Sequence, residues 1–389
     1  MPYIAGMSEP QATIETIHTL SELDRQEWDA VANPEGAVYN PFVSWDFLEA
    51  MESSGSARPE TGWQPAHILL RRGGRIAGAM PAYLKGHSQG EYIFDHAFAD
   101  AYSRAGGRYY PKLLSAVPFT PATARKLLAP QAEDRALLAA GAQQVAARMG
   151  LSGAHLNFLT EEDAQTAEDQ GYVIRIGEQY HFEDRGFGDW QGFLDALASR
   201  KRKALRKERD AIAKSGLAIE WVSGKDIEER HLDAFWWFYQ DTGARKWGNP
   251  YLTRTAFTIL AERMADRLLF IFAKRGDEYI AGAMNLVGGD TLYGRYWGCS
   301  EHVPFLHFEL CYYQAIDYAL THGLKRVEAG AQGEHKIARG YEPVAIRSAH
   351  RMIDPGFHDA VVDYLKRERH HMEEEIELLR GYTPFKKGG

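Results

Sequence analysis

A short string occurs twice in this chain, and this repeat restricts the possible folds more than any other sequence feature. Residues 76–80 and 280–284 both read IAGAM, and each copy follows an apolar run and an Arg-Gly turn. Upstream, NPF at 40–42 is echoed by NPY at 249–251. Because similar strings in the same order indicate a duplicated structural unit, we expect two units with the same topology.

The apolar patterns predict the same order of elements in each half. The first half is expected to contain strands at 66–70, 75–84 and 112–119, a helix at 132–149 and a strand at 155–159. The second half is expected to contain strands at 268–274, 279–287 and 291–299, a helix at 305–320 and a strand at 325–331. A hairpin followed by strand, helix and strand is a mixed α/β unit, and its last step should be a right-handed parallel crossover. The predicted fold class is α/β, with mixed sheets in both units.

Length and composition agree with two globular domains. The chain has 389 residues, of which 45% are hydrophobic and 25% are charged. A glycine-rich break lies at 185–188. We therefore predict domains at 1–185 and 186–389, with a basic helix at 199–214 in the second. A long helix at 359–380 is expected to end the chain with a solvated charged face.

Charge and cysteine content exclude several classes of protein. A formal net charge of -8 argues against a protein whose whole surface coats DNA or anionic lipid. The two cysteines, Cys299 and Cys311, give no disulfide framework, and we expect small buried thiols rather than nucleophiles. The N-terminal residues lack a secretory pattern, and no run of about 18 apolar residues occurs. We expect a cytoplasmic protein without a membrane span.

The helix predicted at 199–214 carries a concentrated positive charge. It holds eight Lys and Arg residues against Glu208 and Asp210, a local charge of +6. Such a patch would attract a phosphate-rich ligand, nucleotide-linked or tRNA, and we expect Arg202 and Arg206 to contact it. The alternative is a solvated helix face whose arginines pair with nearby acids.

Polar residues concentrate in the second half, around the helix at 305–320 and after the last predicted strand. The candidate residues there are His307, Glu309, Gln332, Glu334, His335, Lys336, Arg339 and Tyr341. Open α/β sheets place ligands at the carboxyl ends of parallel strands, and a carboxylate beside an imidazole can accept a proton. The alternative for His307 and Glu309 is a pair of buried hydrogen bonds. The spacing of these His and Glu residues matches no established metal motif, so no metal is expected.

Two segments of the first half also carry candidates. Asp95, His96 and Tyr102 lie in an aromatic-rich segment and are possible substrate contacts, or else buried partners of tyrosine hydroxyls. Thr120, Thr123 and Lys126 precede a predicted helix. Hydroxyls and cations at a helix N-terminus suit a phosphate, although the threonines could simply cap the helix.

Several long strings resemble a bacterial FemAB-like family of predicted N-acyltransferases. They include FDHAFADAY at 94–102, SRKRKALRKER at 199–209, FYQDTGARKWGNPYL at 238–252 and RVEAGAQGEHKIARGYEP at 326–343. The resemblance runs from about Tyr39 to Phe385 and implies two consecutive GNAT-like domains. The second half is similar to that of peptidoglycan aminoacyl transferases, including the Phe308-Glu309 pair. Those enzymes use aminoacyl-tRNA and single-domain relatives use acyl-CoA, and both acylate an amine.

One departure from the acyl-CoA users concerns the pyrophosphate loop. Their loop is rich in glycine, which lets backbone amides approach the phosphates. The corresponding segments here, 119–128 and 299–309, contain no glycine, which weakens the expectation of acyl-CoA and leaves aminoacyl-tRNA or another activated donor open.

The resulting expectation is an N-acyltransferase that moves an acyl or aminoacyl group from a co-substrate to an amine, possibly that of a cell-wall precursor. Glu334 or His335 would accept the proton, Tyr341 would protonate the leaving group, and Lys336 and Arg339 would hold phosphates. Two alternatives are a non-catalytic binding protein for a muropeptide or nucleotide-linked ligand, and a tRNA-dependent transferase acting on protein N-termini.

Overall fold

The two IAGAM strings form equivalent strands of two antiparallel hairpins. The computed structural model describes residues 12–246, 250–330 and 333–386. In the first half, β3 (His67–Arg72) pairs with β4 (Arg75–Met80), and in the second β10 (Leu268–Arg275) pairs with β11 (Glu278–Val287). The predicted duplication of an α/β unit is confirmed at the level of element order.

Each half also contains the expected strand, helix and parallel strand. β6 (Lys112–Ser115) is joined through α4 (Ala132–Arg148) to the parallel strand β7 (Gly153–Leu159). In the second half, β12 (Thr291–Cys299) pairs in parallel with β13 (Arg326–Glu328). The connection is one continuous helical stretch, composed of α10 (Leu306–Phe308), the π-helix η6 (Glu309–Tyr313) and α11 (Gln314–Thr321).

The remaining elements surround these two cores. The first half adds β1 (Ala12–Ile17), α1 (Arg25–Ala32), α2 (Trp45–Ser53), β2 (Trp63–Pro65), β5 (Tyr83–Lys85), α3 (His96–Arg104), α5 (Glu161–Asp169) and β8 (Val173–Glu183). The second half adds α6 (Trp190–Ala196), α7 (Ser199–Ala213), β9 (Ala218–Ser223), α8 (Glu229–Lys246), α9 (Arg254–Met264), the 3-10 helix η7 (Glu334–Arg339), β14 (Glu342–Met352) and α12 (Pro355–Arg380). The basic and C-terminal helices predicted from the sequence are α7 and α12.

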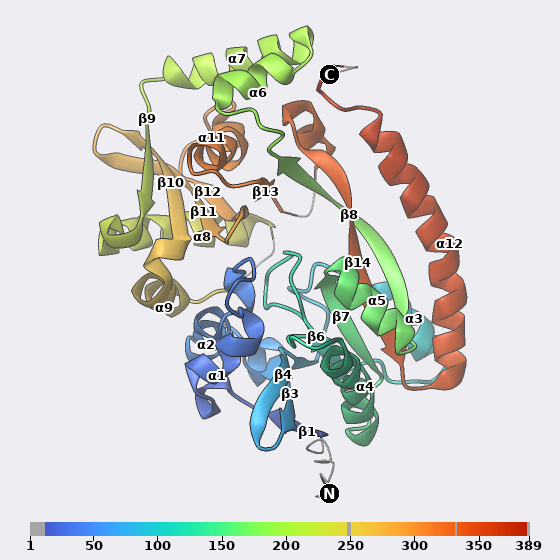
Figure 1. The fold of residues 1–389 in the computed structure, drawn as a ribbon. Coiled ribbons are helices and arrows are strands. Elements are labelled where there is room, and N and C mark those ends of the chain that lie inside the picture. The colour runs from blue at the N-terminus through green and yellow to red at the C-terminus, as the bar shows by residue number, and fades with distance from the viewer. Residues whose placement is uncertain (1–11, 247–249, 331–332, 387–389) are drawn as a thin grey trace, which may run out of the picture.

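One sheet runs through both halves of the molecule (Figure 1). Its strand order is β2-β5-β6-β7-β14-β8-β13-β12-β11-β10-β9, while β1, β3 and β4 form a separate sheet. β14 comes from the end of the chain but lies between β7 and β8 of the first half. β8 then continues past β14 and pairs through its last three residues with β13. The boundary at residues 185 and 186 stays a prediction, because the hydrogen-bonded sheet crosses it.

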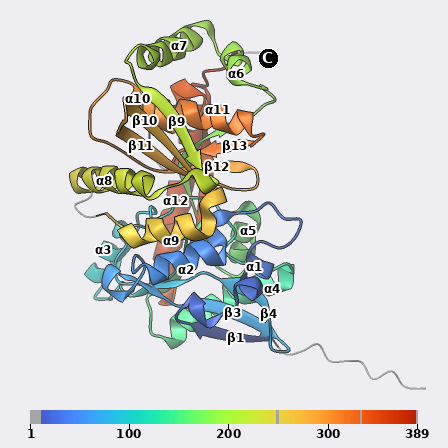
Figure 2. The same cartoon turned by 90° about the vertical axis from the view of Figure 1, so that its left-hand side faces the viewer.

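Two helical contacts add to the connection between the halves. α12 runs along the outer edge of both halves in Figure 1 and packs on β8 and β14. It begins after Asp354, whose carboxylate accepts a hydrogen bond from the Phe357 N–H, and Pro355 occupies its first turn. Figure 2 shows α2 and α9 side by side at the junction, where they are in contact. No helix in the described part of the chain is both long and apolar enough to cross a membrane.

Candidate active site

The parallel strands β12 and β13 separate after a short pairing and leave an open fork. They pair only at Thr291–Tyr293 and Arg326–Glu328. A β-bulge in β12 leaves Arg295 as the extra residue, because Met284 is opposite Tyr296 and Asn285 is opposite Gly294. Beyond Tyr293, no described strand pairs with this edge of β12.

A cavity of about 120 Å³ lies at this fork and is called the fork cavity here. Its described lining consists of Ala283, Met284, Asn285, Gly294, Arg295, Tyr296, Trp297, His307, Cys311, Tyr312, Ala329 and Gly330. Both branches of the fork and the helix after β12 therefore contribute to it. Cys311 is half-buried on this lining, whereas the sequence analysis expected a thiol buried in an apolar helix.

The π-helix explains how two neighbouring residues, Cys311 and Tyr312, both reach the fork cavity. A π-turn inserts one extra residue into an α-helix and changes which side chains face a given side, and such turns are frequent at functional sites. His307, one turn earlier, packs edge-on against Trp297 with ring centres 5.1 Å apart. His307 thus lies on the lining of the fork cavity, while its predicted catalytic role stays a prediction.

His335 reaches the fork cavity through Tyr312. The Tyr312 hydroxyl and His335 Nε2 are 3.0 Å apart. His335 is exposed at the surface, and partial burial together with the positive charges of Arg339 and Lys336 lowers its pKa, which favours the neutral imidazole. Gln332 lies outside the described residues, as does the side chain of Glu334.

Lys336 and Arg339 point inward and hold η7 in place. The Lys336 ammonium donates to the Gly330 carbonyl at 2.9 Å, and burial lowers the pKa of Lys336 to about 8. Arg339 donates to the Glu208 carboxylate at 3.0 Å and lies 3.5 Å over the Phe308 ring. These contacts tie η7 to the fork and to α7. Lys336 is therefore turned away from any phosphate, whereas Arg339 also lines a hollow between η7 and α7.

Two other predicted catalytic residues are buried in packing contacts. Tyr341 is fully buried and its hydroxyl donates to the Tyr312 carbonyl at 3.4 Å. It is therefore shielded from any leaving group. Glu309 accepts hydrogen bonds from Arg209 at 3.2 Å and from Gln314 at 2.7 Å. This buried arrangement corresponds to the structural alternative considered for Glu309.

The basic helix α7 is partly neutralised by local partners. Arg202 pairs with Asp195 at 3.2 Å, and Arg206 donates to the Gln191 side chain at 3.3 Å. Arg200, Lys203, Arg206, Lys207 and Lys214 remain exposed. A hollow of about 360 Å³ lies between α7 and η7, lined by residues that include Arg200, Lys201 and Arg339. A positive surface is thus present, and its ligand stays a prediction.

The equivalent fork of the first half is filled by its own chain. After β6 the chain passes through Phe119, and β7 contains Phe158, both with a positive φ that is unusual for a residue with a side chain. The Lys126 ammonium is buried and donates to the carbonyls of Ala124 and Phe158 at 3.0 and 3.1 Å. In this half the Lys126 side chain therefore occupies the space next to the carboxyl end of β7.

Thr120, Thr123 and Lys126 consequently do not form the phosphate site that the sequence analysis expected. α4 begins only at Ala132, so none of the three lies at its N-terminus. Thr120 is buried and donates to the Pro118 carbonyl at 2.9 Å. The Thr123 N–H donates to Glu328 of the second half, which makes this loop a contact between the halves.

Glu328 is a buried carboxyl at this contact. One of its oxygens has no described hydrogen-bond partner, and His181 Nε2 is 3.9 Å from it. Burial raises the pKa of Glu328 to about 8, although Arg326 and the Thr123 N–H act in the opposite direction. Because the carboxyl binds its proton more tightly in the folded protein, it reduces stability as the pH rises from about 4.5 to about 8.

Glu328→Gln should remove this pH dependence. Relative to wild type, we expect the variant to gain roughly 2–4 kcal/mol in free energy of unfolding between pH 5 and pH 8. Urea denaturation at pH 5, 6.5 and 8 measures the difference. Glu161→Gln, at an exposed carboxylate, is the matched control and should show a constant offset. If the free energy of unfolding of Glu328→Gln also differed from wild type by the same amount at all three pH values, the raised pKa of Glu328 would be contradicted.

A larger cleft of about 500 Å³ opens mainly in the first half and is called the first-half cleft here. Its described lining consists of Glu60, Thr61, Trp63, His87, Ser88, Gln89, Gly90, Tyr92, Phe94, His96, Phe119, Pro250 and Tyr251. His96 thus lies where the sequence analysis placed a substrate contact. Tyr102 does not, because it stacks on Phe357 of α12 with ring centres 4.3 Å apart.

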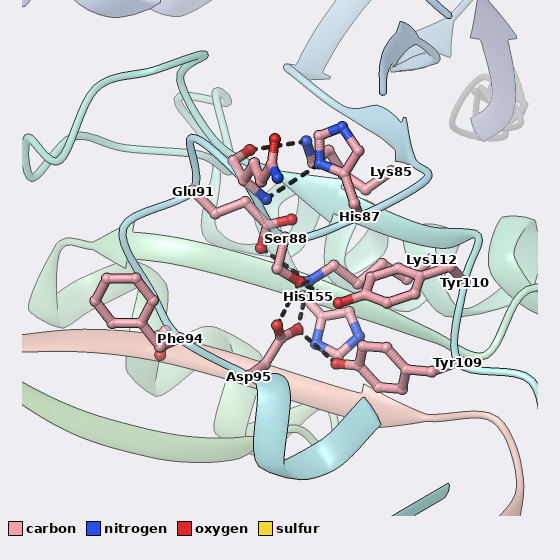
Figure 3. A network of polar contacts seen from close by, with 12 residues as sticks. Lys85, His87, Ser88, Glu91, Phe94, Asp95, Tyr109, Tyr110, Lys112 and His155 are labelled. Carbon is pink, nitrogen blue, oxygen red and sulfur yellow. Dashed lines mark hydrogen bonds and ion pairs between the residues drawn. The ribbon is translucent and has the colours of Figure 1, made fainter. Parts of the chain in front are cut away.

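Asp95 lies beneath the cleft in a buried polar cluster, the Lys112 network, formed by Lys112, Ser88, Glu91, Asp95, Tyr109 and Tyr110 (Figure 3). The Lys112 ammonium pairs with Glu91 at 2.8 Å and with Asp95. Burial raises the pKa of Glu91 to about 7. Burial would also raise that of Asp95, but the Lys112 charge holds the pKa of Asp95 well below its usual value. The network anchors the segment that forms one wall of the cleft.

Arg295 connects the linings of the first-half cleft and the fork cavity. Arg295 lines the fork cavity, and its guanidinium hydrogen-bonds the Tyr92 hydroxyl and the Phe119 carbonyl, both from residues that line the cleft. Tyr92 and Phe119 have positive φ values of 58° and 55°, and such backbone strain clusters at functional sites. Sequence reasoning missed Arg295, Tyr92 and Phe94, although a lone cation in an apolar strand and a dense aromatic segment were visible signals.

The described residues contain no group of three or more His, Cys, Asp or Glu side chains that could hold a metal ion. The side chains on the two linings include hydroxyls, imidazoles, the Cys311 thiol, the Glu60 carboxylate and the Arg295 guanidinium. Such groups are compatible with transfer of an acyl group between two bound molecules.

Comparisons with known proteins agree with the fold. The crystal structure of FemX superposes with a TM-score of 0.53 at 14% identity, covering 86% of this chain and 96% of FemX. A conserved protein of unknown function from Bacteroides thetaiotaomicron superposes with a TM-score of 0.55 at 11% identity, covering 87% and 99% of the two chains. No curated protein matches the sequence. The family model described as FemAB-like, peptidoglycan biosynthesis/recognition, matches residues 19–387, so the chain belongs to the FemAB-like family.

Proposed function

We propose that this protein transfers an acyl or aminoacyl group from an activated donor in the fork cavity to a primary amine in the first-half cleft. The observation that carries the proposal is that Arg295 lines the fork cavity and hydrogen-bonds residues that line the first-half cleft. A donor carbonyl at the fork and an amine in the cleft would approach each other there. Holding two reactants in this way converts a bimolecular reaction into one within a complex. The family description supports a cell-wall acceptor.

The reaction would need three contributions from the chain. The amine nitrogen attacks the donor carbonyl, and N–H groups of β12 beyond Tyr293 stabilise the oxyanion. Tyr312, which lines the fork cavity, then protonates the leaving sulfur or oxygen in the role first expected for Tyr341. His335 takes up the proton lost by the amine, directly or through water, and returns it to Tyr312 across their hydrogen bond. One C–N bond forms and one bond to the leaving group breaks.

Two classes of activated donor are compared here, aminoacyl-tRNA and acyl-CoA. The exposed cations of α7 favour a phosphate-rich donor such as aminoacyl-tRNA. The absence of glycine from 299–309 argues against the usual pyrophosphate cradle of acyl-CoA. Transfer assays with acetyl-CoA and with aminoacyl-tRNA, each supplied with peptide amines and amino sugars and read by the mass of the acceptor, separate the two donors.

Tyr312→Phe tests the mechanism once a donor is identified. Removing the hydroxyl should lower kcat by about 10²-fold, the usual contribution of one positioned proton donor, with little change in KM. Tyr318→Phe is the matched control, because Tyr318 lies on the same helix and stacks on His322 outside the fork cavity. Equal rates for Tyr312→Phe and wild type would remove Tyr312 from the chemistry. Donor binding without transfer to any amine would instead identify a binding protein.

A further inference from the structure

The lining of the first-half cleft has an unusual composition for a site in a protein of this class. Five of its residues are aromatic, two are histidines and one, Glu60, is a carboxylate. Among the lining residues that the structure describes, none is Lys or Arg. Phosphate groups are recognised chiefly by Arg and Lys side chains or by clustered backbone N–H groups, so this lining is poorly suited to a nucleotide-linked or phosphorylated ligand.

The two nearest lysines are occupied below the cleft. Lys85 is fully buried, with its ammonium 3.8 Å from the centre of the Trp63 ring and 3.2 Å from the Gln89 carbonyl. Burial also lowers the pKa of Lys85 to about 7, which weakens its positive charge. Lys112 is paired with two carboxylates in the Lys112 network. Neither cation is directed into the cleft to meet an anion.

The accessible rings form a platform at the cleft. Phe94 is 55% exposed, and its ring stacks with that of His96 at 6.3 Å and 28°. Figure 3 shows Phe94 pointing away from the Lys112 network. Tyr92 and Tyr251 are half-buried and add further ring surface. Exposed apolar side chains in a concave site mark a binding surface, and flat rings pack well against the C–H faces of a sugar.

Polar groups around these rings match a hydroxylated ligand. Ser88 and Gln89 line the cleft between the aromatic residues, and Thr61 and His87 lie on the same lining. Gln89 and His87 offer amide and imidazole groups that can donate and accept hydrogen bonds, whereas the hydroxyls of Ser88 and Thr61 already hydrogen-bond within the protein. Glu60 is the one described lining residue with a carboxylate, and although Arg58 Nε lies 3.6 Å from it, this exposed carboxylate can still accept a hydrogen bond from a ligand amine.

We propose that the first-half cleft binds an amine-bearing saccharide that carries no phosphate, such as an oligomer of glucosamine. The aromatic platform contacts the sugar rings, the polar groups contact the hydroxyls, and the Glu60 carboxylate accepts a hydrogen bond from the amine. The assignment of this amine as acceptor rests on the proposed function, whereas binding of the saccharide does not. A nucleotide-activated sugar is disfavoured, because the described lining of the cleft contributes no Lys or Arg side chain to its phosphates.

Calorimetric titration of the full chain tests this with three probes: the glucosamine trimer, the N-acetylglucosamine trimer and UDP-N-acetylglucosamine. We expect the glucosamine trimer to bind most tightly. Phe94→Ala should weaken this binding about tenfold, the order expected for the loss of one ring contact. Tyr382→Ala is the control, because Tyr382 is 63% exposed but does not line the cleft, and its removal should leave the affinity unchanged.

Several results would overturn the proposal. They are tighter binding of UDP-N-acetylglucosamine than of either trimer, equal binding of both trimers, no binding of the glucosamine trimer at millimolar concentration, or an unchanged affinity in Phe94→Ala. Failure of the saccharide-binding proposal can be told apart from failure of the proposed acyl transfer. Saccharide binding without acyl transfer leaves the cleft assignment intact, while transfer to a peptide amine without saccharide binding overturns only the ligand class.

Discussion

Replacing Lys112 by Met is expected to lower the free energy of unfolding by about 3–5 kcal/mol, because it leaves two carboxylates buried without their cation. Lys112 is about 1% exposed and contacts Glu91 at 2.8 Å and Asp95. Ser88, which accepts from the Lys112 ammonium at 3.1 Å, would lose a partner as well. Urea denaturation at pH 7 measures the loss.

A triple variant separates loss of charge balance from loss of packing. Combining Lys112→Met with Glu91→Gln and Asp95→Asn removes both carboxylates together with the cation, and should recover much of the lost stability. A Lys112→Met protein within about 1 kcal/mol of wild type would show that the network contributes little to the fold. An equally large loss in the triple variant would assign the effect to packing around the Lys112 side chain.

Gly294→Leu is expected to close the fork cavity and reduce acyl transfer by at least about 10²-fold. A Cβ at residue 294 would lie 3.4 Å from the Glu328 carbonyl, 3.5 Å from Asn285 Oδ1 and 3.7 Å from the Ala329 Cα. These are ordinary contact distances, so a methyl group fits. A longer side chain would extend between β12 and the residues that follow β13, where the donor carbonyl is placed in our proposal.

Gly294→Ala is the matched control for this substitution. It should keep most of the transfer activity, because its Cβ meets no atom closer than 3.4 Å. Thermal denaturation of both variants checks that the fold is retained, and titration with the active donor measures the affinity directly. Full donor affinity in a folded Gly294→Leu protein would place the donor elsewhere and contradict the proposed function.

The sequence predicted the local elements well, because their signals lie within short segments. The IAGAM hairpins, the helix at 132–149 and the basic helix at 199–214 all occur at the expected positions. The insertion of β14 between β7 and β8 was beyond such reasoning. An alternating strand pattern shows which face is buried, but carries little information about distant strand partners.

Only some residues of the candidate site could be predicted from the sequence, because the others depend on irregular local geometry or on long-range packing. His307 and His96 lie on the two cavities, as their positions suggested. Tyr312 was missed because the π-turn changes the face expected from a 3.6-residue period. Tyr341 was assigned a catalytic role from its hydroxyl, but its complete burial depends on packing between segments that are distant in sequence. Arg295 reaches the site through a β-bulge, which periodicity does not reveal.

The position of β14 has a consequence for how the protein is made. On the ribosome, residues 153–183 emerge long before Glu342–Met352 does, so β7 and β8 are synthesised without the strand that lies between them. The first half therefore cannot complete its native sheet while translation is still under way in the second. Domain-by-domain maturation from the N-terminus is common in multidomain chains, but here we expect the first half to complete its sheet only after β14 has been synthesised.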